Sequence, residues 1–313
     1  MNIIRNALAF SADLPDDKTL AEAMEPMRFQ PITEVQAQSL GFVETHVGEG
    51  LVVPFERGMT FALRIDEKVL PAAPVKMEIQ KAIDDATADA GHELDKARIA
   101  DIKEEVMARL ISTALTKTTM IRVLYWPEDK LLLVATSSER NAQLLMSMLV
   151  RTCESVKTTT IHVDGVRFGL TAHLRNHLEG KPKDFGQLRI GDSVTLKNEG
   201  EKIVVDVSSL DHAQEGLLEA IRGGMHVEKL ELEHGTMAFV LNDKFRFSKV
   251  CFYGDDAEED GQSDDEVEDF ATLWARSAFI EASQFASAMR ELCTVFSRQT
   301  DIEIDHAKAV SEE

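Results

Sequence analysis

The sequence predicts an α+β protein, because short antiparallel hairpins and amphipathic helices follow one another along the chain. Alternating apolar side chains at 60–66 and 120–126 predict strands, and a turn at 127–130 leads the second of them into a return strand at 131–136. Apolar residues spaced by three and four predict helices, two of them in the charged stretch that follows Pro74. These features favour mixed antiparallel sheets with long helices.

The first half of the chain predicts a clear order of elements. We expect a strand at 2–10, a short helix at 16–25, the strand at 60–66, two charged helices separated at Ala90-Gly91, the hairpin at 120–136 and a helix after Ser137 or Ser138. Pro74 suits a helix start, since its missing N–H costs nothing there. The second charged helix carries an apolar stripe of Ile99, Ile102, Val106 and Leu110.

The second half mixes strands and helices again. We expect strands at 158–170, 188–196, 202–207, 227–232, 236–241 and 244–253, a two-residue turn at Asn242-Asp243, and a helix from Asp211 to about Arg222. Residues 255–269 contain ten acids and no base, so we expect a mobile loop there, and helical spacing then runs from Val267 to Phe296. At about 150 residues per domain, the length predicts two parts, which we place at 1–155 and 156–300.

Charge is unevenly distributed along the chain. The formal net charge is −21, from 34 basic and 55 acidic residues, and such acidity argues against a nucleic-acid partner. Residues 251–313 hold 4 basic and 17 acidic residues, whereas residues 101–200 hold 14 basic and 12 acidic residues. A locally basic surface is therefore compatible with the composition.

Cysteines and apolar runs indicate the compartment. The three cysteines are far apart and form no C-x-x-C pair, which favours a reducing cytoplasm and argues against a structural zinc site. No apolar run approaches the 18 residues of a membrane span, so we expect no membrane partner.

The chain carries no complete catalytic or metal-binding motif. Walker loops, G-x-G-x-x-G, G-x-S-x-G and H-E-x-x-H are all missing. His173 and His177 have the spacing of a helical zinc pair, but Leu174 takes the place of the catalytic Glu and no third ligand is evident, which favours ordinary histidines. Residues 256–261 resemble the start of a calcium loop, yet Val267 stands where the bidentate Glu belongs. We therefore expect no cofactor, no metal and a solvated acidic loop.

Two groups of basic residues are candidate nucleic-acid contacts. The first lies on the charged helices and the strand after them, and consists of Lys76, Lys81, Lys103, Arg109, Lys117 and Arg122. Periodicity alone favours a salt-bridged helix face for this group, because acids are interspersed among its members. The second group is less diluted by acids and consists of Arg167, Arg175, Lys181, Lys183 and Arg189.

Four segments carry a resemblance to a known family. They are Glu67-Lys68-Val69-Leu70-Pro71 with Pro74-Val75-Lys76, Lys103-Glu104-Glu105-Val106, Gly224-Met225-His226-Val227-Glu228-Lys229-Leu230, and Glu268-Asp269-Phe270-Ala271. In this order and spacing they resemble the bacterial RdgC family of recombination-associated proteins over almost the full chain.

The resemblance implies a horseshoe-like monomer that closes into a dimeric ring. The ring is implied to encircle double-stranded DNA without sequence preference and to limit the access of a RecA-like recombinase, in the cytoplasm at the nucleoid. An acidic exterior can then surround a basic lumen, since phosphate contacts need only local Lys and Arg. The candidate DNA contacts are Lys76, Lys81, Lys117, Arg122, Arg167, Arg175, Lys181 and Lys183, and Leu115 is the candidate for a dimer interface.

Three positions depart from the family pattern, and two other functions stay open. Thr113, Ser209 and Met225 stand about where relatives carry basic or amide side chains. We expect a DNA-binding protein that is not an enzyme. One alternative is a metal-dependent exonuclease whose carboxylates the fold brings together, and the other is an acidic DNA mimic that uses Asp255 to Asp269 against a DNA-binding partner.

Overall fold

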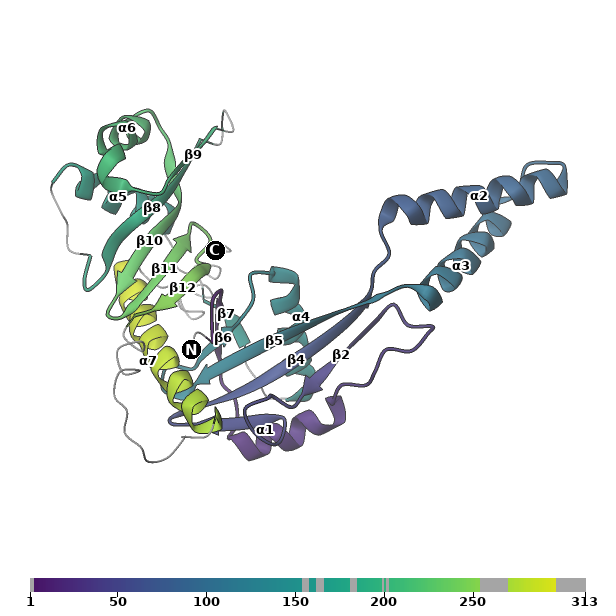
Figure 1. Cartoon of the computed structure of the whole chain (residues 1–313), viewed down its shortest axis with the longest axis horizontal. Coiled ribbons are helices and arrows are strands. Elements are labelled where there is room, and N and C mark those ends of the chain that lie inside the picture. Colours follow the sequence, from purple (N-terminus) through teal and green to yellow (C-terminus); the bar gives the residue numbers. More distant parts are fainter. Residues whose placement is uncertain are drawn as a thin grey trace, which may run out of the picture. The chain divides into compact units, whose positions relative to one another are not determined.

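The computed structural model describes residues 3–153, 158–161, 166–180, 185–198, 200, 203–253 and 270–296 (Figure 1). The elements of the first half are β1 (Leu8–Ala12), α1 (Asp17–Met24), β2 (Gln38–Val43), β3 (Val52–Phe55), β4 (Gly58–Lys68), α2 (Ala72–Ala90), α3 (Lys96–Thr113), β5 (Thr116–Trp126), β6 (Leu131–Val134) and α4 (Glu139–Thr152). Those of the second half are β7 (Thr158–Thr160), α5 (Val166–Leu178), β8 (Arg189–Asn198), β9 (Ile203–Val207), α6 (Leu210–Arg222), β10 (His226–His234), β11 (Met237–Asn242), β12 (Phe247–Phe252) and α7 (Phe270–Val295). Short 3₁₀ turns, at Glu25–Met27 and Pro127–Asp129, complete the described structure.

The strands form two antiparallel sheets, so the predicted α+β class is confirmed. The first sheet has the order β2-β4-β5-β6-β1-β7, with β3 also paired to β4. The second has the order β12-β11-β10-β8-β9, and its central strand β10 pairs with β11 on one side and β8 on the other.

The chain forms two compact units. Unit 1 consists of Met1–Ala23, Glu44–Phe61 and Arg122–Glu313, and unit 2 consists of Met24–Val43 and Ala62–Ile121. The domain boundary expected near residue 155 stays a prediction, and unit 1 draws its segments from both sides of that residue.

Helix α7 organises the core of unit 1. Its aromatic side chains meet both sheets: Trp274 lies 6.3 Å from Phe55 of β3 and Phe285 lies 5.5 Å from Phe247 of β12, measured between ring centroids. Ala278, Ala282 and Leu292 of the same helix are also fully buried. Since burial of such side chains stabilises by about 1.5–3 kcal/mol for each large one, α7 contributes heavily to this unit.

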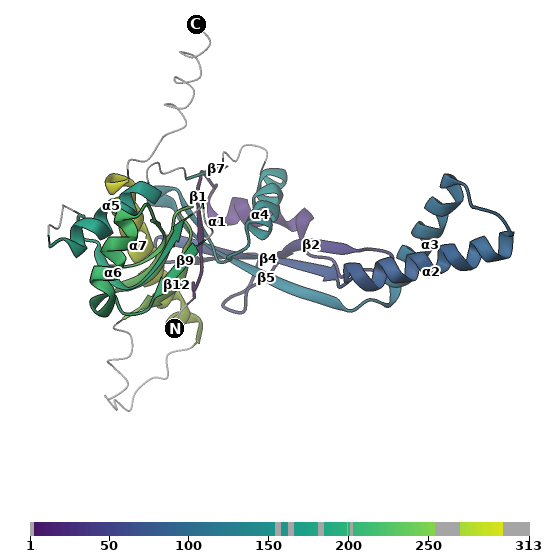
Figure 2. The ribbon, with the colours of Figure 1, turned by 90° about the horizontal axis from the view of Figure 1, so that it is seen from above.

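One face of the second sheet packs against helices. Helix α5 packs on β10 and helix α6 on β8 (Figure 1), and Figure 2 shows the two helices on one side of this sheet. Val194 and Leu196 of β8 share the buried face with Leu230 of β10, as expected when successive side chains of a strand point to opposite faces. The opposite face, called the open face below, carries the exposed Lys229 and Lys249 together with the buried Val240.

Unit 2 contains β2, most of β4 and the helices α2 and α3. β2 approaches the segment before it so closely that a Cβ at Gly41 would lie 2.4 Å from Cα of Phe29, which only glycine avoids. α2 buries no side chain and α3 buries only Ile102 and Val106. The two helices therefore form a hairpin with a thin core.

Four expectations about local structure were wrong. Residues 166–170 are the first turns of α5, so the expected strand at 158–170 is wrong there, and among the described residues of this stretch Thr158–Thr160 form a strand. The hairpin turn after β11 is longer than two residues, because the Asn242 side chain accepts hydrogen bonds from the backbone N–H groups of Lys244 and Arg246 and Phe245 adopts φ 57°. The helix expected to be capped by Asp211 begins two residues earlier, with Ser209 at the N-cap. The first strand begins at Leu8, not at residue 2.

Candidate nucleic-acid interface

Lys76 and Lys81 lie on α2 and are exposed. Pro71 precedes the helix, and Gly91 ends it in the left-handed conformation that glycine adopts without strain, donating its N–H to the Thr87 carbonyl. Neither lysine forms an ion pair with a carboxylate in the described part of the chain. Both ammonium groups are therefore available to a ligand.

Helix α3 is partly salt-bridged, as its periodicity suggested. Asp95 caps the helix by accepting the N–H of Arg98 at 2.8 Å. Arg109 binds Glu78 of α2 at 3.0 Å, and this ion pair joins the two helices. The structure thus separates Arg109, which is engaged, from Lys76 and Lys81, which are not.

Lys117 and Arg122 belong to β5. Lys117 is exposed in unit 2, whereas Arg122 is half-buried in unit 1. Burial of the His46 ring lowers the pKa of that side chain, and the charge of Arg122 lowers it further. The proximity of His46 and Arg122 is a feature that the sequence did not predict.

The second basic group is only partly described. Arg175 of α5 binds Glu179 at 3.3 Å, and Glu179 also binds Arg222 of α6 at 3.2 Å. The Arg167 side chain, Lys181, Lys183 and the acidic run 255–269 lie outside the described residues. Arg189 is exposed at the start of β8.

The three positions that depart from the family pattern have ordinary structural roles. The Thr113 hydroxyl donates to the Arg109 and Leu110 carbonyls in the last turn of α3. Ser209 shares a 2.8 Å hydrogen bond with His212, and Met225 packs against the core of unit 1. None of the three side chains carries a charge toward a ligand.

The described residues contain no metal centre that geometry supports. His173 and His177 do lie on a helix, α5, but the His173 ring stacks on Phe185 with centroids 4.0 Å apart. In the described part of the chain no three His, Cys, Asp or Glu side chains are grouped to hold an ion. Of the described helices, none is long and apolar enough to cross a membrane.

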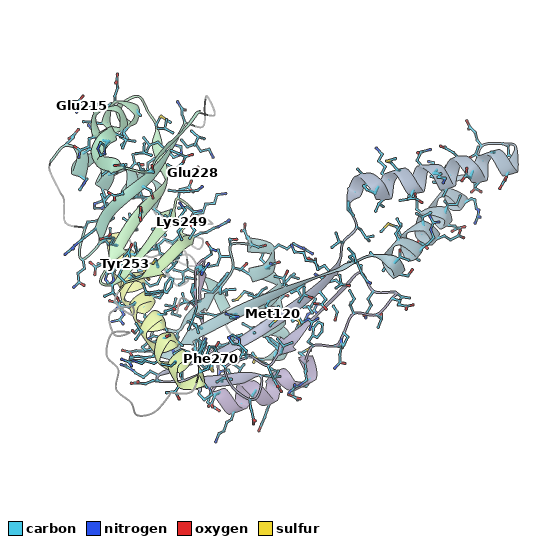
Figure 3. The ribbon with its side chains drawn as sticks, in the orientation of Figure 1. Met120, Glu215, Glu228, Lys249, Tyr253 and Phe270 are labelled. Atoms are coloured by element: carbon cyan, nitrogen blue, oxygen red, sulfur yellow. The ribbon has the colours of Figure 1, made fainter. Side chains whose placement is uncertain are left out.

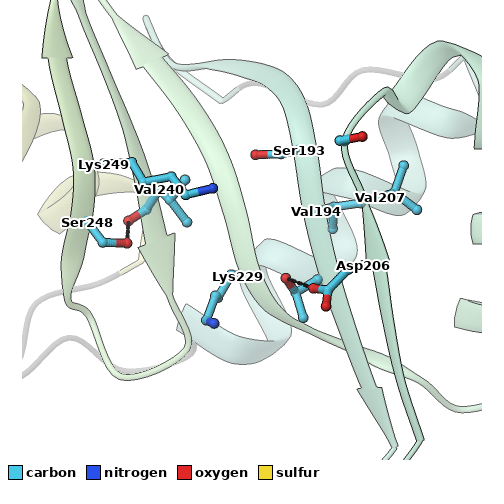
Figure 4. Close-up of a pocket in the computed structure, with 10 residues that line it drawn as sticks. Ser193, Val194, Asp206, Val207, Lys229, Val240, Ser248 and Lys249 are labelled. Atoms are coloured by element: carbon cyan, nitrogen blue, oxygen red, sulfur yellow. Dashed lines mark hydrogen bonds between the residues drawn. The ribbon is translucent and has the colours of Figure 1, made fainter.

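A polar hollow on the open face of the second sheet was not predicted. It combines residues from β8 to β12, among them Lys229 and Lys249 (Figure 4), and Figure 3 labels Lys249 in the whole chain. Two irregular strand pairings create it, and sequence patterning carries no signal for them. Lys229 lies within one of the family-like segments, which is the only hint that the sequence offered.

These elements define a class of protein: an α+β chain with two antiparallel sheets and a thin helical hairpin that presents unpaired lysines. A family model described as "Putative exonuclease, RdgC" matches residues 3–299, and the chain belongs to the RdgC family. The resemblance seen in the sequence is thereby confirmed.

Relatives with the name recombination-associated protein RdgC match most of the chain. The protein of Shewanella loihica is 24% identical over 257 residues, which cover 80% of this chain and 82% of the relative. That of Shewanella halifaxensis is 26% identical over 258 residues with the same coverage. That of Pseudoalteromonas atlantica is 21% identical over 290 residues, or 92% of this chain and 94% of the relative.

Proposed function

We propose that this chain is a non-enzymatic protein that binds double-stranded DNA without sequence preference. It acts as a ring-shaped dimer in the cytoplasm at the nucleoid, and it modulates homologous recombination by limiting the access of a RecA-like recombinase to DNA. The observation that carries the proposal is the family match over residues 3–299, together with the recombination-associated name of the relatives.

Free cations on an acidic chain support DNA binding. Lys76, Lys81 and Lys117 are exposed and have no carboxylate partner among the described residues, although the net charge is −21. Unpaired ammonium groups gain the most from phosphate, because they release counterions from DNA without breaking an existing ion pair. Acidic residues on α2 and α3 nearly balance the basic ones, so the helical hairpin as a whole is close to neutral.

The helical hairpin supports self-association. Met77 is 72% exposed on α2 and Leu115 is 82% exposed just after α3, while α2 itself buries nothing. Helices α2 and α3 together hold six basic and seven acidic residues. The face of the helical hairpin that we propose for dimerisation is the surface around Met77 and Leu115, and a second copy can approach it without the repulsion expected from the net charge of the whole chain. Closing a ring from two chains needs self-complementary interfaces on the twofold axis, and this face is our candidate for one.

Binding of duplex DNA over a range of salt tests the proposal. If Lys and Arg hold phosphates, log affinity falls linearly with log salt, with a slope of about −0.9 per contact. Duplexes of different sequence should compete equally well. A wild-type chain that binds no duplex at low salt, or that discriminates strongly between sequences, would contradict it.

Adding a divalent metal ion distinguishes DNA binding from the nuclease alternative. The family description, "Putative exonuclease, RdgC", is the reason to test that alternative. We expect end-labelled duplex to stay intact with Mg²⁺ or Mn²⁺ present. Metal-dependent release of nucleotides would favour an exonuclease instead. Binding to a RecA-like protein in the absence of DNA would favour the acidic DNA mimic.

A further inference from the structure

The open face of the second sheet contains a hollow of about 480 Å³. Its lining mixes polar residues with three valines and comes from four strands and the end of β9: Ser193, Val194, Thr195, Asp206, Val207, Ser208, Lys229, Val240, Ser248 and Lys249. Figure 4 shows the Lys249 side chain extending from β12 toward β10 over this face. Two lysines and four hydroxyl groups thus line this hollow together with three valines and one aspartate.

An irregularity in β10 brings Lys229 to this face. Val227 pairs with Leu196 and Lys229 pairs with Thr195, so β10 has one residue more than β8 at this point. Without the extra residue, Lys229 would alternate onto the same buried face as Val227. The bulge turns it outward instead, beside Thr195.

A second irregularity, in β12, does the same for Lys249. Val240 of β11 pairs with Ser248, and Ala238 pairs with Cys251, which leaves one extra residue in β12. Lys249 occupies this bulge with φ 51°. This is a left-handed backbone conformation, which costs free energy for a residue other than glycine. As a result Ser248 and Lys249, although adjacent in sequence, both line the hollow.

Two carboxylates at or near the hollow, those of Asp206 and Glu231, keep their negative charge and accept hydrogen bonds from its hydroxyl groups. The Thr195 hydroxyl donates to Asp206 at 2.6 Å, and the N–H and hydroxyl of Ser193 donate to Glu231 at 2.9 and 2.7 Å. Lys229 and Lys249 have no carboxylate partner among the described residues, whereas the neighbouring Lys197 binds Glu228 at 3.2 Å.

The hydroxyl groups divide into engaged and available ones. The Ser193 and Thr195 hydroxyl groups donate their hydrogen bonds to these carboxylates and have no second proton for a ligand. Ser248 makes only a long 3.4 Å bond to the Val240 carbonyl, which a better acceptor can replace. The donors left for a ligand are therefore Lys229, Lys249, Ser208 and Ser248.

We propose that this hollow holds a phosphodiester group of the DNA backbone between Lys229 and Lys249, with hydroxyl donors from Ser208 and Ser248. This inference rests on the proposed function, DNA binding. It adds a second DNA-binding site, on the second sheet and outside the helical hairpin of α2 and α3. Phosphate oxygens accept several charge-assisted hydrogen bonds at once, which fits two ammonium groups flanked by hydroxyls. The bulges explain why the strands accept a strained Lys249, since strained backbone positions often serve a ligand site.

The test measures duplex binding by the full-length chain between about 50 and 200 mM salt. Lys229→Gln and Lys249→Gln should each reduce the magnitude of the salt slope by about 0.9, and the double variant by about 1.8. Lys244→Gln, an exposed lysine of the loop between β11 and β12 outside the hollow, is the matched control and should leave the slope unchanged. Inorganic phosphate, added at constant ionic strength, should compete only weakly, because a single free phosphate lacks the other contacts of the duplex.

The outcomes separate the site from the function. A wild-type slope in both lysine variants would overturn the site while leaving DNA binding intact, and so would an equal loss in Lys244→Gln. Strong competition by inorganic phosphate would assign the hollow to a free phosphate compound instead. Absence of duplex binding by the wild-type chain would overturn the proposed function itself.

Discussion

Asp66 is one of four buried polar or charged side chains among the described residues, with Thr60, His234 and Glu281. Its carboxylate accepts two hydrogen bonds from Arg64, at 2.9 and 2.8 Å, and one from the Thr118 hydroxyl at 2.8 Å. Arg64 also lies over the Phe29 ring, 4.4 Å from its centroid. These contacts tie β4 to β5 and to the segment before β2 within unit 2.

We expect Asp66→Asn to lower the free energy of unfolding by about 1–3 kcal/mol, because the amide turns a donor toward Arg64 and leaves buried groups unpaired. Denaturant titration at neutral pH measures the change. Asp13→Asn removes an exposed ion pair with Lys130 and should cost less than about 1 kcal/mol. Equal losses in the two variants would contradict this account of Asp66.

The same contact gives a pH dependence. Hydrogen bonds from Arg64 lower the pKa of Asp66, and they outweigh the desolvation that raises it. A depressed pKa contributes stability above the unfolded value of about 3.9, and this stability is lost as the pH falls through the lower folded value. Below pH 4 the wild type should therefore lose stability more steeply than Asp66→Asn.

At the scale of elements, regular patterns predicted regular structure. The strand at 60–66, the two charged helices and the helix after Ser138 were predicted because their apolar residues repeat with one clear period. The Ser138 hydroxyl accepts the N–H of Asn141 and so caps α4 as expected. The strands β2 and β3 were missed, since Gly41 and Pro54 interrupt their short apolar runs.

The remaining errors arise where tertiary contacts override local preference. Residues 166–170 contain β-formers, but α5 packs Leu170 and Leu174 into the core of unit 1 and its helical spacing prevails. The hollow could not be predicted, because it depends on bulges that turn Lys229 and Lys249 to the same face. A strict alternation along β10 would have placed Lys229 on the same buried face as Val227.

Helix α2 carries a prediction for DNA binding. Reversing both Lys76 and Lys81 to Glu should weaken duplex binding and reduce the salt slope by about 1.8, if each lysine holds one phosphate. Lys18→Glu with Lys244→Glu changes the net charge by the same amount at exposed positions elsewhere and should have a smaller effect. Circular dichroism confirms that the helices are retained. Equal weakening by both pairs would mean that only overall charge matters.

For the whole molecule, the prediction concerns assembly. The wild-type chain should sediment as a dimer at micromolar concentration, and Met77→Asp with Leu115→Asp should shift it to a monomer, because two charges would be buried in the proposed interface. Val150→Asp introduces a charge at a half-exposed apolar residue of α4 and should leave the dimer intact. A monomeric wild type that still binds DNA would contradict the ring.

Helix α7 contacts the first residues that the structure describes. Glu281 of α7 is buried and accepts the backbone N–H groups of Ile3 and Ile4 at 2.7 and 2.9 Å, across 278 and 277 residues of sequence. A ribosome releases residues 3 and 4 long before Glu281 is synthesised, so unit 1 cannot close its core until α7 has left the ribosome. The segments of unit 1 that are synthesised first therefore expose apolar surface until α7 is available. We expect chaperones to bind the nascent chain during this interval.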